Sequence, residues 1–360
     1  MSHALAPSPA ETVPAKLWSP KRVLVTPGAL AWPHGAAMVE RAAVLGAEVV
    51  RLKADRLSGL PDKYASAKGT LAVVVASPSR RKPQPIPPSA DWRFDLAEGC
   101  PAHCQYCYLA GSLAGPPITR AYANLPEILG ELAPLLGQGR VTSLQAERAA
   151  EGTTFEAGCY TDPLAIEHVT GSLAASIAHF GAWDAPVQLR FTTKFDGIEP
   201  LLALPHRGRT RIRFSVNARA AERFEGGTAR MPQRLGALRR AALAGFPVGL
   251  TVAPIMPLPD WQAEYAGLLT AASAALDGIP GVDLTVELIS HRFTPGSKDV
   301  LRGWYPGSAL EMDEAQRTRK LTKFGSTKWV YPKEIMSTMR GFLERALVET
   351  LPQARLLYWT

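Results

Sequence analysis

Three cysteines lie close together in one short stretch, at Cys100, Cys104 and Cys107, with three residues between the first two and two between the last two. The chain has one further cysteine, Cys159. Thiolates so close on one loop converge easily on a metal centre, and iron–sulfur clusters are held by cysteine thiolates. A four-iron cluster with three such ligands keeps one iron open, which is a place for chemistry rather than only electron storage. The spacing therefore predicts a four-iron, four-sulfur (4Fe–4S) cluster.

The same cysteines also fit a structural zinc site. Zinc takes four thiolates, and Cys159 would then be the fourth ligand. On that interpretation the chain would be a zinc-stabilised DNA-binding protein without catalysis. The spacing alone leaves both metals open.

Composition excludes several other classes of protein. The chain has 360 residues, 46% of them hydrophobic and 20% charged, which is ordinary for a soluble globular protein of one large or two modest domains. Four cysteines, three of them clustered, do not resemble a disulfide scaffold. The first residues lack a basic start followed by an apolar stretch, so no signal peptide is expected and the predicted location is cytoplasmic. A net charge of +8 favours polyanionic partners such as nucleic acid.

The elements before the cysteine loop predict a small N-terminal α/β unit at residues 19–88. A disordered lead over 1–18 is followed by strands and one helix, with apolar patterns typical of each: strands 21–25, 47–52 and 70–76, and helix 36–45. A proline-rich, basic connector over 78–90 is expected to be extended rather than helical.

Strands then alternate with helices, which predicts right-handed crossovers and a parallel sheet over residues 89–300. The expected strands are 91–97, 118–123, 153–157, 187–193, 211–215, 247–253 and 283–288, and the expected helices are 126–136, 166–179, 200–203, 232–244 and 261–275. About six units fit, short of the eight of a full barrel. In such barrels the chemistry lies on the loops after the strands, where the notable polar residues and the cysteine loop also fall.

The C-terminal region, residues 301–360, has a different pattern. A basic helix is expected at 314–321, a β-hairpin at 323–331 around Gly325, an amphipathic helix at 334–349 and a closing strand at 355–358.

The cysteine spacing resembles that of the radical S-adenosylmethionine (SAM) superfamily, and the surrounding residues resemble the spore photoproduct lyase family over roughly residues 85–360. The stretches that carry the resemblance are 100–109, 120–125, 155–162, 193–194, 214–217, 253–256, 290–294 and 310–313.

The resemblance implies a partial (β/α)6 TIM-type radical SAM barrel with SAM on the open iron. It implies a DNA repair lyase that reverts spore photoproduct (5-thyminyl-5,6-dihydrothymine) to two thymines. The reduced cluster cleaves SAM, and the 5′-deoxyadenosyl radical removes the C6 hydrogen of the lesion. The bond between the thymines then breaks and a cysteine returns a hydrogen. An electron donor such as a flavodoxin or ferredoxin is implied as a partner.

The family's roles can be carried onto matching residues. Cys159 matches the hydrogen donor, although a free cysteine is also a common buried core residue. Tyr106 and Tyr108 match tyrosines that pass the radical onward, although packing around the cluster would explain them too. His291 and Arg292 at the last strand end are candidate lesion contacts, with structural pairing as the alternative.

Seven residues at successive strand ends match the SAM pocket of the family: Glu156, Thr161, Asp162, Lys194, Ser215, Asn217 and Ala253. A carboxylate or hydroxyl can hold the amino group or ribose of SAM, and Lys194 can pair with its carboxylate. The backbone near Ala253 is expected at the adenine. Taken singly, each side chain is also explained as a satisfied polar group at a strand end.

The chain departs from the family in the hairpin, where an Arg-Tyr pair that contacts the lesion is replaced by Lys323 and Phe324. Lysine keeps the charge but loses the bidentate fork, and phenylalanine keeps the stacking face but loses the hydroxyl. A radical SAM enzyme for a different nucleic acid lesion or modification is therefore the alternative function. Lysines around Trp329 fit phosphate contact or a solvated basic surface: Lys320, Lys323, Lys328 and Lys333.

Overall fold

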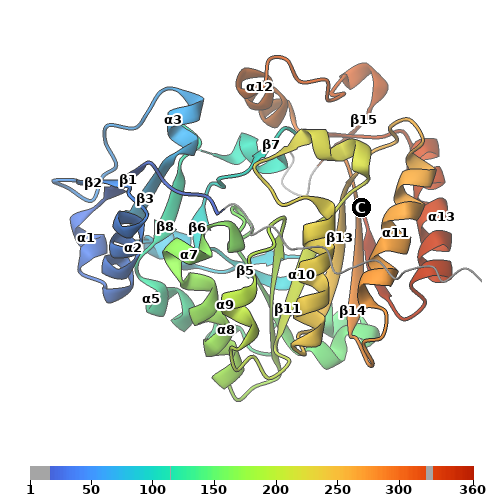
Figure 1. The fold of residues 1–360 in the computed structure, drawn as a ribbon, viewed down its shortest axis with the longest axis horizontal. Coiled ribbons are helices and arrows are strands. Elements are labelled where there is room, and N and C mark those ends of the chain that lie inside the picture. The colour runs from blue at the N-terminus through green and yellow to red at the C-terminus, as the bar shows by residue number, and fades with distance from the viewer. Residues whose placement is uncertain (1–16, 114, 322–326) are drawn as a thin grey trace, which may run out of the picture.

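A computed structural model describes residues 17–113, 115–321 and 327–360 (Figure 1). Two sheets organise these residues, and Figure 1 shows the smaller one, in blue, beside the larger one. The expected disordered lead falls, as far as residue 16, outside the described residues. None of the described helices is both long and apolar enough to cross a bilayer.

The smaller sheet has five strands in the order β2-β1-β3-β8-β6. They are β1 (Arg22–Val25), β2 (Glu48–Arg51), β3 (Thr70–Val74), β6 (Ala97–Glu98) and β8 (Thr119–Tyr122). Its helices are α1 (Pro27–Leu30), α2 (Pro33–Val44) and α3 (Tyr64–Lys68). The apolar runs of β1 and β3 are almost wholly buried, as expected for parallel strands inside a sheet. The early strands and the helix at 36–45 are confirmed.

The cysteine loop is held at both ends by this smaller sheet. β6 immediately precedes the loop, β8 follows it, and the two strands pair antiparallel, with Ala97 opposite Ala121. β8 also pairs in parallel with β3 of the N-terminal unit. The strand expected at 118–123 therefore exists but lies outside the barrel sheet. Strands β6 and β8, which lie after residue 89, complete the smaller sheet. The division of the chain at residue 89 therefore stays a prediction.

The larger sheet is a curled half-barrel of eight strands in the order β17-β14-β13-β11-β10-β9-β5-β4 (Figure 1). They are β4 (Gln84–Ile86), β5 (Ala90–Phe94), β9 (Thr153–Ala157), β10 (Val187–Thr193), β11 (Thr210–Val216), β13 (Val248–Ile255), β14 (Leu284–Ser290) and β17 (Arg355–Trp359). The strands from β5 to β14 are mutually parallel, β17 joins in parallel, and β4 is antiparallel. The partial (β/α)6 barrel is confirmed.

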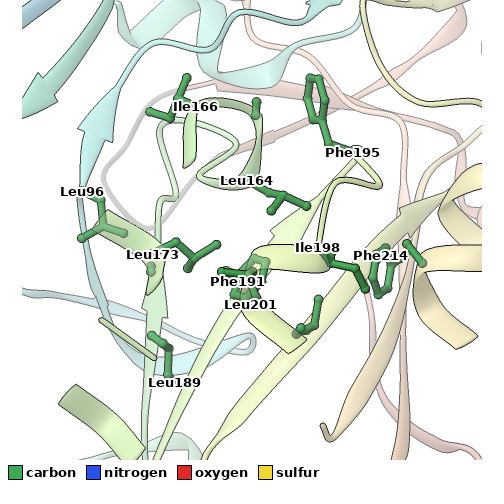
Figure 2. Close-up of a cluster of buried hydrophobic side chains, with 14 of the residues drawn as sticks. Leu96, Leu164, Ile166, Leu173, Leu189, Phe191, Phe195, Ile198, Leu201 and Phe214 are labelled. Atoms are coloured by element: carbon green, nitrogen blue, oxygen red, sulfur yellow. The ribbon is translucent and has the colours of Figure 1, made fainter. Parts of the chain in front are cut away.

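Helices cover the outer face of this sheet (Figure 1). They are α7 (Glu167–Thr170), α8 (Ser172–Ala182), α9 (Glu199–Leu202), α10 (Met231–Leu243), α11 (Trp261–Leu276) and α13 (Lys333–Thr350). Figure 2 shows Leu173 of α8 and Leu201 of α9 near Phe191 and Phe214 of the strands. All four side chains are fully buried, and each burial stabilises the fold by roughly 1.5–3 kcal/mol.

The inner face of the barrel is polar, because side chains alternate along each strand. In β11, Ile212 and Phe214 belong to the apolar core, whereas Arg211 and Arg213 are buried charged residues. Arg213 is paired with Glu287 of β14 at 2.7 Å. Pairing of this kind offsets part of the cost of burying charge, and it leaves the barrel lined by groups that can orient a polar ligand.

Three local predictions were wrong. Residues 314–321 are a short 3-10 turn (Glu314–Gln316) followed by strand β15 (Thr318–Leu321), because the backbone of β15 pairs with the next strand, β16 (Thr327–Val330), in an antiparallel hairpin. The connector begins with a short helix, α4 (Pro78–Arg81), in which proline occupies the first turn, where it is tolerated. The helix at 166–179 is broken at Gly171, whose φ is +65°.

The remaining elements shape the loops. The helices are α5 (Leu125–Gly130), α6 (Val141–Leu144) and α12 (Pro295–Trp304), and a two-stranded ribbon joins β7 (His103–Cys104) to β12 (Glu225–Gly226). α12 was not expected from the sequence; its start is capped by Thr294, whose hydroxyl accepts the N–H of Ser297 at 3.0 Å. The expected helix at 334–349 and the closing strand at 355–358 are confirmed as α13 and β17.

Candidate active site

The cysteine loop is fixed by backbone contacts on two sides. Gly99 has φ +77°, and a Cβ there would lie 2.1 Å from the carbonyl oxygen of Ile118, so only glycine fits. On the other side, Cys104 pairs with Glu225 in the ribbon, and the N–H of Gln105 donates to the carbonyl of Phe224 at 2.9 Å. These contacts fix the backbone of the loop before Cys100 and between Cys104 and Cys107.

The three loop cysteines are free and only partly exposed. Burial raises the pKa of the Cys100 thiol to about 11 and also raises the pKa values of Cys104 and Cys107. The sulfurs are near enough that Cys100 and Cys107 disfavour a thiolate at Cys104, while the ammonium of Lys194 favours it. The ammonium of Lys68 likewise favours thiolates at Cys100 and Cys107.

These three sulfur donors fit an iron–sulfur cluster. Metal ligation releases thiol protons, and irons would remove the mutual repulsion between the thiolates. Among the described residues, no three or more His, Cys, Asp and Glu side chains already stand in a geometry for a single metal ion. A four-iron cluster does not require such a geometry, because each cysteine would ligate a different iron.

Lys194, at the end of β10, brings three predicted pocket residues together. Its ammonium donates to the hydroxyl of Ser215 at 2.8 Å and to the carbonyl of Ala253 at 3.3 Å. It also donates to Glu225 at 3.0 Å and lies 5.4 Å from the ring centre of Tyr106. Because Lys194 also affects the Cys104 thiol, a fixed positive charge lies beside the cysteine loop.

Glu225 is the buried anion at the centre of this group. Its carboxylate accepts hydrogen bonds from Lys194, from the hydroxyl of Tyr106 and from the guanidinium of Arg234 in α10. Burial favours the protonated form, but the charges of Lys194 and Arg234 outweigh it and hold the pKa of Glu225 at about 2. Glu225 therefore stays ionised and keeps the Lys194 side chain in place.

Two further predicted pocket residues use their polar groups within the protein. Asp162 accepts the backbone N–H of Lys194 at 2.7 Å and the hydroxyl of Thr193 at 2.8 Å, while burial raises its pKa to about 6. The amide of Asn217 donates to the carbonyl of Pro254 at 2.9 Å and accepts the hydroxyl of Tyr265 at 2.8 Å. Both side chains position the strand ends that form the pocket.

Thr161 differs from these residues. Its side chain is buried, and its hydroxyl has no hydrogen-bond partner among the described residues. A buried hydroxyl without a partner costs free energy, so Thr161 is the predicted pocket residue with a polar group still available to a ligand.

Glu156 belongs to the charged lining of the barrel. Its carboxylate pairs with Arg213 at 2.6 Å and accepts the hydroxyl of Ser89. Arg213 also pairs with Glu287, so one guanidinium is held between two carboxylates. Glu156 therefore lies in a different group from Lys194 and Ser215.

Cys159 lies in this second group. Burial raises the pKa of its thiol well above the usual range, and the carboxylates of Glu156 and Asp95 raise it further. Asp95 is itself paired with Arg93 at 3.1 Å. The groups that most affect Cys104 are instead Lys194 and Glu225, so the fourth cysteine stands in a separate charged environment and favours the thiol form.

The two predicted tyrosines face different partners. Tyr106 is buried and its hydroxyl donates to Glu225. Tyr108 is half-buried, and the guanidinium of Arg292 lies 5.5 Å from its ring centre. Tyr106 thus connects the cysteine loop to Lys194, and Tyr108 connects it to the end of β14.

The two residues after β14 also separate. His291 is buried against Arg317, whose guanidinium is 3.2 Å from Nδ1, and burial with the charges of Arg317 and Arg292 lowers its pKa to about 3. His291 is therefore a neutral packed side chain. Arg292 is half-buried and donates to the hydroxyl of Thr360 at 3.1 Å.

The hairpin lies beside these residues and its stem is described. Phe293 and Trp329 exchange two backbone hydrogen bonds of 3.1 and 2.7 Å, which anchors β16 to the chain after β14. Lys323 and Phe324 lie outside the described residues. Figure 1 shows β7, α12 and β15 at the same end of the molecule.

The sequence profile described as spore photoproduct lyase matches residues 18–360. The chain belongs to the spore photoproduct lyase family. A spore photoproduct lyase from Geobacillus sp. (strain Y412MC61) is 37% identical over 358 residues, covering 96% of this chain and 100% of the relative. One from Bacillus subtilis (strain 168) is 36% identical over 348 residues, covering 95% and 98%.

Solved structures of the spore photoproduct lyase family share the fold. One contains bound AdoMet and dinucleoside spore photoproduct, and another is complexed with dinucleoside spore photoproduct. Each superimposes with a TM-score of 0.87 at 36% identity, covering 96% of this chain and 100% of the other.

Several residues of this candidate active site were not predicted from the sequence. Glu225 pairs with both Lys194 and Arg234, and the charge of Asp95 affects Cys159. Asp95 follows β5 directly, so the strand-end rule that selected Lys194 could have found it. Glu225 follows an irregular stretch, and only its pairing with the cysteine loop reveals it.

Proposed function

We propose that the chain is a radical SAM DNA repair lyase that reverts spore photoproduct to two thymines. The observation that carries the proposal is the grouping of Lys194, Ser215 and Glu225 beside the three-cysteine loop, with the thiol of Cys159 in a separate group of the same barrel. Family membership supports it, as do neighbours solved with AdoMet and dinucleoside spore photoproduct. Family membership also favours an iron–sulfur cluster over a zinc ion at the three loop cysteines.

Cys100, Cys104 and Cys107 would hold the 4Fe–4S cluster. When bound, the cluster and SAM supply the 5′-deoxyadenosyl radical that begins the reaction. The protein's own contribution is to fix the three thiolates between positive charges, with Lys194 affecting Cys104 and Lys68 affecting Cys100 and Cys107.

Lys194 would pair with the carboxylate of SAM. Its ammonium is already aimed by Ser215 and Glu225, so little side-chain freedom is lost when a ligand carboxylate arrives. The hydroxyl of Thr161 lacks a partner among the described residues and is suited to a polar group of SAM. Asp162 and Asn217 hold the strand ends, and the backbone at Ala253 would contact the adenine.

Cys159 would return the hydrogen to the product. The S–H bond of Cys159 gives a hydrogen atom to the thymine radical, which completes the thymine and leaves a sulfur radical on the cysteine. Burial and the carboxylates of Glu156 and Asp95 keep the thiol protonated, which is the form that carries this hydrogen. Tyr106 and Tyr108 would pass the radical onward, and the carboxylate of Glu225 is placed to accept a proton from Tyr106.

DNA would approach across Arg292, Lys320 and Lys328. The pKa of Lys328 is lowered by burial and by the charges of Arg292 and Lys320, so both of these cations lie close enough to repel Lys328. A phosphate would relieve this repulsion, and phosphate contacts by lysine and arginine dominate the affinity of proteins for DNA. Lys323 and Phe324, which lie between β15 and β16 in the sequence, are proposed to contact the lesion. His291 is buried against Arg317, so it would support this basic surface rather than contact DNA.

The same function implies a cytoplasmic location, where DNA and a small reducing protein such as a flavodoxin or ferredoxin are present. Lys323 and Phe324 replace the family's Arg-Tyr pair. This substitution favours one second candidate function, a radical SAM enzyme that acts on a different nucleic acid lesion or modification.

Metal analysis and substrate comparison test the proposed function. Anaerobically reconstituted protein is expected to be brown with four irons and matching sulfide, and one colourless zinc per chain would contradict it. Duplexes that carry spore photoproduct or a cyclobutane thymine dimer are then compared in SAM cleavage and lesion loss. Loss of spore photoproduct alone supports the assignment. SAM cleavage without loss of spore photoproduct would support radical SAM chemistry but contradict the assignment of this lesion as the substrate.

A further inference from the structure

A buried lysine from the N-terminal unit donates hydrogen bonds to the backbone of the cysteine loop. Lys68 is the last residue of α3 and is only 8% exposed. Its ammonium donates to the backbone carbonyl of Cys100 at 2.7 Å and to that of Ala102 at 2.6 Å. One side chain therefore fixes the backbone at the first cysteine of the loop.

Aromatic residues surround the same ammonium. It lies 5.8 Å from the ring centres of both Tyr64 and Trp304. The hydroxyl of Tyr64 bonds to Nδ1 of His103 at 2.9 Å and to the hydroxyl of Tyr305. These contacts join α3, the cysteine loop and the end of α12 around Lys68 and separate its charge from bulk water.

Such an ammonium needs a counter-charge. Burying an ion costs several kcal/mol unless an opposite charge compensates it. Within the described part of the chain, the two hydrogen bonds of Lys68 go to neutral carbonyl oxygens, and none of the ion pairs found there includes it. The loop that Lys68 holds carries the three proposed cluster ligands, and its hydrogen bond to the carbonyl of Cys100 places the ammonium beside the first of them, so a thiolate-ligated cluster would supply the counter-charge.

We propose that Lys68 is a positioning residue whose fixed charge balances the thiolate-ligated cluster, holds the cysteine loop to the N-terminal unit and makes the cluster easier to reduce. The inference rests on the proposed function for the cluster itself. A reduced cluster is one charge more negative than an oxidised one, so a nearby cation stabilises the reduced form. Net charge and hydrogen bonding around a cluster are established determinants of its potential.

The test compares reconstituted parent protein with Lys68→Gln, Lys68→Arg and the control Lys63→Gln, which alters an exposed lysine just before α3. Iron and sulfide content, the midpoint potential and the rise in Tm on cluster loading are measured for each. Lys68→Gln is expected to shift the reduction equilibrium about tenfold toward the oxidised form, about 59 mV more negative for one electron. Its rise in Tm on loading should be smaller, whereas Lys68→Arg and Lys63→Gln should match the parent.

Comparing loaded with cluster-free protein cancels the hydrogen bonds that Lys68→Gln loses in both forms. Loss of the cluster from Lys68→Gln with retention by Lys68→Arg would support the proposal. A Lys68→Gln variant with four irons and the parental potential would overturn it, as would a Lys68→Arg variant that behaves like Lys68→Gln. A parent protein without iron would overturn the proposed function as well, so the two failures are distinct.

Discussion

Lys194 and Glu225 form a 3.0 Å ion pair next to the cysteine loop, although they lie on different elements of the barrel. Glu225 also pairs with Arg234 and accepts the hydroxyl of Tyr106. One buried carboxylate thus links the helix-covered outside of the sheet, the cysteine loop and the lysine proposed to bind SAM.

Glu225→Gln is expected to destabilise the fold and to remove part of its acid sensitivity. Removing one partner of a buried pair costs about 3–5 kcal/mol, because Lys194 and Arg234 then lack their anion. The pKa of Glu225 is lowered in the folded state, to about 2, from an ordinary value of 4.5. Its contribution is therefore full above pH 4.5 and is lost as the pH falls toward 2.

Urea unfolding between pH 3 and 7 measures this effect. The difference in free energy of unfolding between parent and Glu225→Gln should shrink as the pH falls below about 4.5. Glu344→Gln is the matched control, because Glu344 pairs with Arg340 on the exposed face of α13, and such a pair contributes about 0–1 kcal/mol. A difference that stays constant with pH would contradict the ionised state of Glu225.

Lys194→Ala is expected to weaken SAM binding roughly 10- to 100-fold, because a hydrogen bond to a charged group contributes about 1.5–3 kcal/mol. Equilibrium binding of SAM to the reconstituted protein measures the change. Lys298→Ala is the control, since Lys298 pairs with Glu314 beside α12 and should leave SAM affinity unchanged. Equal SAM affinity in parent and Lys194→Ala would remove Lys194 from the pocket.

Cys159→Ala is expected to cleave SAM at close to the parental rate and yet to give adducts or stalled product in place of clean thymine. The reason is that Cys159 lies in a different charged group from the cysteine loop and Lys194. Chromatography of the nucleoside products, together with 5′-deoxyadenosine yield, separates the two steps. An unchanged yield of thymine from this variant would show that another group returns the hydrogen.

Lys328→Gln is expected to weaken binding to duplex DNA at low salt and to reduce the slope of log affinity against log salt by about one. Lys328 lies close to Arg292 and Lys320, so its charge adds directly to their attraction for phosphate. Fluorescence anisotropy over a salt series measures the slope. Lys53→Gln, in an exposed loop of the N-terminal unit, is the control, and equal slopes for both variants would place DNA elsewhere.

Strands and strand-end residues were predictable where one sequence pattern determines them. Residues 153–157 and 187–193 are strands with the expected bounds, because apolar and β-branched side chains recur along them. Lys194 and Ser215 were found through the rule that chemistry follows the strands of such barrels. The structure brings their side chains to within 2.8 Å.

Contacts between distant segments could not be read from the sequence. Even in the hairpin, β15 was expected to be helical, because the charge spacing of residues 314–321 does not encode their pairing with β16. Glu225 reaches the site through a two-residue ribbon with the cysteine loop. Lys68 of the N-terminal unit contacts the cysteine loop. The loop lies beside this unit because β6 and β8, which follow the first barrel strands in the sequence, belong to the smaller sheet. The last two cases depend on where two remote segments meet.

Repair of the dinucleoside lesion tests the proposed function most directly. Reconstituted protein, dithionite, SAM and dinucleoside spore photoproduct are incubated without oxygen, and the lesion and the thymine product are both quantified. Conversion of each lesion to two thymines, dependent on SAM and absent from a Cys104→Ala variant, is the predicted result. An unchanged lesion in the presence of an intact cluster and ongoing SAM cleavage would contradict it.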